Sequence, residues 1–182
     1  MRGRGRQLAI ALLIAGLLIA LAFSLKKTPV RGLPSGKIVV TPKAGPWWAY
    51  PDPIRTPGLP NPQITQSNVE ETICNPDWDK TAFRPASSYT TRLKREQMQA
   101  WGLPGTTSDY EEDHFISLEL GGSNDISNLW PEAANPKPGF HEKDQVENYL
   151  HEQVCAGSIS LLDAQTEIST NWLTIYNEMP PK

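Results

Sequence analysis

The spacing of apolar residues along the chain predicts several helices and one short hairpin of extended chain. Between residues 87 and 101, Leu93, Ala100 and Trp101 lie at i, i+7 and i+8, which places them on one face of a helix. The hydroxyl-rich start of this segment and Gly102 after its end are typical helix boundaries. We therefore expect a helix here that packs a narrow apolar stripe on the core.

A hairpin is expected next, because apolar and polar side chains alternate with the period of a strand over residues 109–120. Glycine and Asx residues at 121–125 favour a reversal of the chain, since they accept positive φ or cap their own backbone. Residues 126–130 would then form a short return arm.

Two more helices are predicted in the last third of the chain. The first runs from about His141 to Cys155 and has an apolar stripe made of Val146, Tyr149, Leu150 and Val154. The second begins at Ser160, with Asp163 three residues on as in a capping box, and runs to about Asn177. The expected fold class is therefore α+β, with a short β-hairpin plus helix packed among additional helices.

Residues 1–25 have the composition of an export segment. Three arginines precede a charge-free, mostly apolar run from Leu8 to Leu25, whose length lies between that of a signal-peptide core and that of a membrane-spanning helix. The small residues Ala20 and Ala22 favour cleavage, whereas the length of the run favours a membrane anchor. Both alternatives place the remainder outside the cytoplasm, either membrane-anchored or released.

Residues 26–62 are dense in proline and glycine, which predicts an extended linker between this segment and a domain at 63–182. Trp47, Trp48 and Tyr50 interrupt that composition. They are consistent with a plain spacer, with contact to a membrane interface, or with packing on the domain.

The chain has two cysteines, Cys74 and Cys155. In an oxidising compartment we expect them to form a disulfide, which would contribute about 4 kcal/mol by restricting the unfolded chain. Two free thiols are the alternative for a cytosolic protein. Neither cysteine belongs to a C-x-x-C pair, which argues against a zinc knuckle.

The formal net charge is −3, which argues against a protein that adheres broadly to nucleic acid through its overall charge. A compact basic cluster nevertheless precedes the hairpin, and it comprises Arg84, Arg92, Lys94 and Arg95. Arg92, Lys94 and Arg95 are candidate substrate-binding residues. The alternative is that they form a solvated helix face.

Candidate chemistry is concentrated in the hairpin. His114 would end the first arm, and Asn128 would lie across the turn, where its carbonyl could accept an imidazole N–H. That bond would leave the other ring nitrogen free to take a proton from water. Asp113 would point toward a divalent cation that neutralises charge on a phosphate. These residues predict hydrolysis of phosphodiester bonds.

The same residues resemble a known family. Asp113-His114, Gly121-Gly122, Asn128-Leu129 and a following helix are similar to the ββα-metal nucleases of the HNH endonuclease superfamily, and the segment from Glu111 to Glu132 resembles a group of small bacterial HNH-like nucleases. The resemblance covers residues 74–176. It implies that His114 is the general base, Asp113 a metal ligand and Asn128 the residue that orients the histidine.

The second metal ligand of the motif has several candidates. His141 at the start of the helix is our candidate, with Asn135, Asn148 and His151 as competitors. The distance in sequence from Asn128 to His141 is longer than in the common motif, and the usual flanking cysteine pairs are missing. The expected cofactor is one divalent cation, Mg²⁺ first, with Mn²⁺ or Zn²⁺ as alternatives.

The leading hypothesis from the sequence is a metal-dependent endonuclease that acts on DNA outside the cytoplasm. Because the chain lacks a glycine-rich phosphate loop and a serine-nucleophile motif, nucleotide-binding and serine-hydrolase functions are not favoured. One alternative is a catalytically silent cell-envelope binding module that kept the nuclease scaffold. Another is a phosphoesterase that uses the same site on a different substrate.

Overall fold

The structure is a computed structural model, and it describes residues 45–180 apart from the side chains of Lys80 and Thr81. The expected signal or anchor segment and the first part of the proline-rich linker fall outside that range. Within residues 45–180, no helix combines the length and the apolar character needed to cross a membrane.

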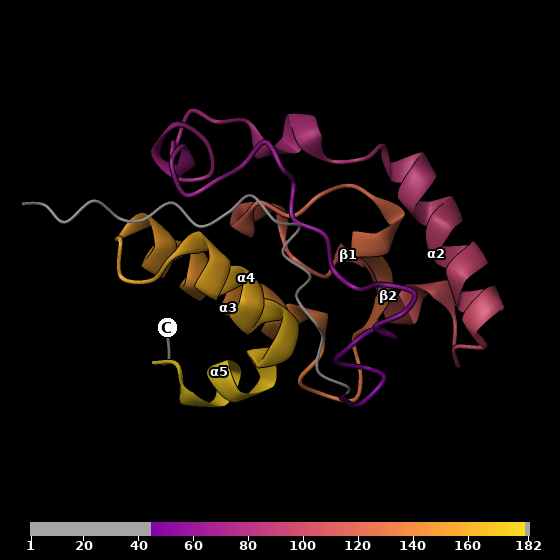
Figure 1. Cartoon of the computed structure of the whole chain (residues 1–182). Helices are drawn as coiled ribbons and strands as arrows, with labels where there is room; N and C mark the ends of the chain where they lie inside the picture. The colour runs from indigo at the N-terminus through magenta and orange to yellow at the C-terminus, as the bar shows by residue number, and fades with distance from the viewer. Residues whose placement is uncertain (1–44, 181–182) are drawn as a thin grey trace, which may run out of the picture. The chain divides into compact units, whose positions relative to one another are not determined.

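This part of the chain has the predicted α+β architecture, with four α-helices and a two-stranded antiparallel sheet (Figure 1). Short 3₁₀ turns link several of the elements. In chain order, the helices and strands are α2 (Ser87–Trp101), β1 (Tyr110–His114), β2 (Leu129–Ala133), α3 (Phe140–Cys155), α4 (Leu161–Thr170) and α5 (Trp172–Glu178).

The hairpin is shorter than the sequence predicts. β1 and β2 pair so that His114 lies opposite Leu129, and both strands have five residues. The prediction of an arm that reaches residue 120 is wrong, because β1 ends at His114. Residues 115–118 are all buried, whereas a strand with one face toward solvent would bury only every second residue. The return arm likewise begins at Leu129 rather than at Ile126, which lies in a 3₁₀ turn.

The loop between the strands is held in shape by the buried side chain of Asn128. Its Oδ1 accepts the backbone N–H groups of Leu59, at 3.2 Å, and Ile116, at 3.0 Å. Its Nδ2 donates to the carbonyls of Ile116 and Ser123, both at 2.9 Å. One amide therefore replaces the ladder bonds that a longer strand would have made.

The hairpin lies between two helical layers. α2 contacts both strands, and α3 packs against α4, α5 and the loop turn η4 (Leu118–Leu120) (Figure 1). Burial of apolar side chains from these layers forms the main core. Its largest fully buried members include Phe115, Ile116, Val146, Ile168 and Trp172.

The single C-terminal helix that the sequence predicts is divided in two. Asn171 leaves the helical region, with φ −143° and ψ 10°, and separates α4 from α5. The break follows Ser169 and Thr170, which have low helix propensity. It allows Trp172 to enter the core, where the indole Nε1 donates to the Ala49 carbonyl at 2.7 Å.

The chain from residue 45 to 62 packs on the domain, which differs from the extended linker predicted there. Ala49, Tyr50 and Thr56 are buried, and the Tyr50 ring lies 6.2 Å from that of Trp172. Proline prevents regular helix and strand in this segment, but it does not prevent burial of the side chains between the prolines. Of the alternatives for these aromatic residues, packing on the domain is observed for Tyr50 and Trp48, whereas Trp47 is exposed.

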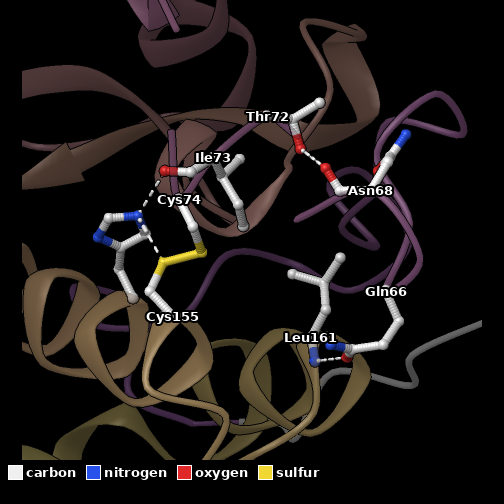
Figure 2. The surroundings of a disulfide bond; sticks show 8 residues. Gln66, Asn68, Thr72, Ile73, Cys74, Cys155 and Leu161 are labelled. Atoms are coloured by element: carbon white, nitrogen blue, oxygen red, sulfur yellow. Dashed lines mark hydrogen bonds between the residues drawn. A yellow bond between two sulfur atoms is a disulfide. The ribbon is translucent and has the colours of Figure 1, made fainter. Parts of the chain in front are cut away.

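The predicted disulfide between Cys74 and Cys155 is confirmed, and it joins cysteines with a sequence separation of 81 (Figure 2). It joins the segment that follows η1 (Val69–Glu71) to the last residue of α3. A disulfide is compatible with an extracellular location, where such bonds persist.

Candidate active site

A pocket of about 290 Å³ lies between the end of β1 and the side of α3. Asp113 and His114 reach it from β1, and α3 contributes Asp144, Glu147 and Asn148. The remaining lining residues come from the segments around them: Arg84, Glu111, Ser117, Leu118 and Glu119. The dipeptide selected from the sequence and the face of the following helix therefore meet in one cavity.

His114 is buried, at 7 % exposure, and its ring is held by Asn124. The imidazole Nε2 lies 2.8 Å from Asn124 Oδ1. Because a carboxamide oxygen only accepts, Nε2 carries the ring proton and Nδ1 keeps its lone pair. Burial lowers the pKa of His114, although Asp113 and the Asn124 bond oppose that shift. The ring is therefore neutral at pH 7 and can act as a base.

Asn128 is not the hydrogen-bond partner of the imidazole, contrary to the geometry expected for it. Among the described residues its side chain bonds to backbone groups of the loop and of Leu59, so it acts on His114 through the fold. The residue that holds the ring is Asn124, whose place in the sequence indicates only a turn. Gly121 and Gly122 precede it closely in the sequence, and an Asn near glycines is typical of a turn, so its contact with His114 has no local signal.

Asp113 lines the pocket and also forms an ion pair with Lys143 of α3. Lys143 Nζ donates to Asp113 Oδ2 at 2.7 Å. Burial would raise the pKa of this carboxyl, but the Lys143 charge and hydrogen bond outweigh burial and lower the pKa below its usual value. Asp113 is therefore ionised near neutral pH.

The pocket has an excess of acidic groups. Burial, together with the charge of Asp113, raises the pKa of Glu111 and of Asp144. Repulsion among carboxylates in a partly buried site favours any arriving cation, and oxygen ligands of this kind suit Mg²⁺ and Mn²⁺. Arg84 adds a guanidinium at the same pocket, and its charge helps to lower the pKa of His114.

The structure places the candidates for the second metal ligand at different sites. His141 is exposed beside Phe140, with ring centroids 4.2 Å apart, and does not line the pocket. Asn135 is exposed before the cis peptide bond to Pro136. Asn148 lines the pocket one helical turn after Asp144. The α3 face toward Asp113 therefore offers Asp144 and Asn148 rather than His141.

The basic residues predicted to bind substrate lie away from the pocket lining. Lys94 Nζ donates to the carbonyls of Thr107 and Tyr110, both at 2.7 Å, and so connects α2 to the start of the hairpin. Arg92 forms an exposed pair with Glu96, 3.8 Å apart. Such a pair contributes little to stability. Arg95 is exposed on the same helix, and of the basic cluster only Arg84 lines the cavity.

A second group with metal-binding chemistry surrounds the disulfide. Cys74, His151 and Cys155 place their ligand atoms within 4.8 Å of one another, a grouping that could hold a metal ion such as Zn²⁺. In the oxidised protein, the two sulfurs bond to each other and offer no thiolate. His151 Nε2 instead lies 2.8 Å from the Ile73 carbonyl, in the surroundings drawn in Figure 2. In this state the group is a structural crosslink.

No protein-family profile, curated protein or solved structure matches the chain. The functional interpretation therefore depends on the residues of the pocket themselves.

Proposed function

We propose that the protein is a metal-dependent endonuclease of the HNH type that hydrolyses phosphodiester bonds of DNA. The observation that supports this most strongly is the meeting of a neutral, buried imidazole with an ionised carboxylate and a polar helix face in one pocket. A general base, an anionic metal ligand and space for a phosphate are the elements that this reaction requires.

In this proposal, His114 Nδ1 takes the proton of the attacking water, while Asn124 holds Nε2 and so keeps the ring in the basic tautomer. Asp113, Asp144 and Asn148 would hold the divalent cation. Mg²⁺ is the first candidate, and the cation would supply positive charge that stabilises the phosphate as negative charge develops. Arg84 would contact a phosphate oxygen, because a guanidinium matches that geometry.

We further propose that the protein works outside the cytoplasm, tethered to the membrane by residues 1–25. The disulfide Cys74–Cys155 is compatible with that location. In the proposed setting, the acidic chain depends on the bound cation and Arg84, rather than on overall charge, to attract a polyanion.

The test is cleavage of supercoiled plasmid DNA by the purified full-length chain with Mg²⁺ or Mn²⁺, and with EDTA as the metal-free control. The full chain is needed, since removal of the first 60 residues would delete the buried Tyr50 and Thr56. His114→Ala should lower the rate by about 100-fold or more. His141→Ala is the matched control, and because His141 is exposed outside the pocket it should keep wild-type activity.

Equal cleavage by His114→Ala and wild type would refute the role of His114. A folded wild-type protein that cleaves neither DNA nor RNA nor small phosphodiesters with any metal would instead support the silent binding module. Cleavage of small phosphodiesters alone would support a phosphoesterase with another substrate.

A further inference from the structure

Lys143 is a fully buried cation directly beside the proposed active site. Its side chain is 1 % exposed, and its Nζ is surrounded by oxygens from both strands and from its own helix. It donates to Asp113 Oδ2 at 2.7 Å, to the His114 carbonyl at 3.0 Å and to a Glu147 carboxylate oxygen. A Glu132 oxygen lies 3.5 Å away as an ion-pair partner. We refer to these four oxygen-bearing groups as the oxygen cage.

The composition of the oxygen cage is that of a cation site. It combines three carboxyl groups with one backbone carbonyl, and hard divalent cations bind such all-oxygen sets. An ammonium has three N–H donors, and Asp113, Glu147 and the His114 carbonyl use all three.

Glu132 carries an independent sign that the cage exceeds what an ammonium can satisfy. Its side chain is completely buried, and no hydrogen-bond donor among the described residues reaches either carboxyl oxygen. A buried carboxyl without a donor is costly unless a cation or a proton neutralises it. The cage therefore contains one more carboxyl group than the three N–H donors of Lys143 can bind.

We propose that Lys143 is a built-in substitute for a metal ion, filling the oxygen cage and thereby positioning Asp113 for a single divalent ion in the adjacent pocket. Asp113 and Glu147 belong to both places, since they line the pocket and contact the ammonium. With Lys143 present, the cage excludes a second cation by charge and by volume. The positioning of Asp113 rests on the function proposed above, whereas the occupancy of the cage does not.

The experiment compares the number of Mn²⁺ ions bound by the full-length wild type and by two variants in equilibrium dialysis. Lys143→Ala removes the charge and vacates the space, so it should bind one more Mn²⁺ per chain than wild type. Lys143→Met removes the charge but fills much of the same volume, so it should not gain an ion. Lys94→Ala is the matched control, because its ammonium binds two backbone carbonyls outside the cage.

Folding of the variant supplies a second readout. If Lys143→Ala is unfolded in EDTA, Mn²⁺ should restore a cooperative thermal transition, and Glu132→Gln added to Lys143→Ala should weaken that rescue. A folded Lys143→Ala protein with the wild-type number of Mn²⁺ ions would overturn the proposal. So would an unfolded one that Mn²⁺ does not rescue, or an equal gain of Mn²⁺ by Lys94→Ala.

The result is separable from the nuclease assay, because it is a difference in bound ions between variant and wild type. A wild-type protein that cleaves no DNA, together with a Lys143→Ala variant that gains one ion, would refute the proposed function and support the role of Lys143 in the cage. A wild-type protein that cleaves DNA, together with a Lys143→Ala variant that gains no Mn²⁺ ion, would support the proposed function and refute the role of Lys143 in the cage.

Discussion

Replacement of Asn128 by alanine should destabilise the whole domain, although this residue touches no reacting group. The substitution removes four hydrogen bonds, which together hold Leu59, Ile116 and Ser123 around the loop. At about 1 kcal/mol net for each bond the loss would be about 4 kcal/mol. The bonds to Leu59 and Ser123 are only part-buried, so water can partly replace them. We therefore expect a loss of about 3 kcal/mol.

Urea unfolding followed by tryptophan fluorescence measures this loss, with Asn124→Ala as the comparison. Asn124 is exposed, so its replacement should lower the free energy of unfolding by less than about 1 kcal/mol. Asn128→Asp should be at least as harmful as Asn128→Ala, because it sets a carboxylate oxygen against the carbonyls of Ile116 and Ser123. A loss below about 1 kcal/mol for Asn128→Ala would refute the inference that this amide holds the loop.

Three other predictions follow from the same contacts. The double variant Cys74→Ser, Cys155→Ser should lose about 4 kcal/mol of stability, and an unchanged thermal midpoint with and without reductant would contradict that. Burial raises the pKa of the Glu112 carboxyl from 4.5 to about 8, so in metal-free protein this group removes stability as the pH rises between those values. Glu112→Gln should therefore unfold at a higher urea concentration than wild type at pH 8 but not at pH 4. Asn124→Ala should lower the pKa of His114 further in an NMR titration, because burial already lowers it and the Asn124 bond opposes that shift; an upward shift would argue against this bond.

The sequence was sufficient for the elements whose signals are local. The helix at 87–101 ends at Gly102, which has φ 66° and accepts the left-handed cap. The reversal of the chain between β1 and β2 depends on Gly122, where an added Cβ would lie 1.7 Å from the Ile116 carbonyl oxygen. Both glycines are visible in the sequence, and each dictates its backbone through elementary sterics.

The features that the sequence could not provide depend on tertiary contacts. The alternation of residues 109–120 has the same appearance in a strand and in a buried loop, and only packing against α3 and the core decides between them. Tyr50 is surrounded by prolines, so its burial against Trp172 has no local signal.

The candidate site shows the same division. Asp113 and His114 could be selected because an ordered motif surrounds them, whereas Asn124 and Lys143 have no such pattern. Lys143 resembles any charged residue on an amphipathic helix, and only the fold brings it to Asp113 and Glu132. The residue type of His141 suggests a metal ligand, but His141 is exposed and does not line the pocket.

The most direct test of the proposed function is a crystal structure of the protein soaked with Mn²⁺ and recorded for anomalous scattering. The proposal predicts one Mn²⁺ peak in the pocket, bound by Asp113 together with Asp144 or Asn148 and within one water of the His114 ring. A peak confined to the group of Cys74, His151 and Cys155, or no peak within reach of Asp113, would contradict it.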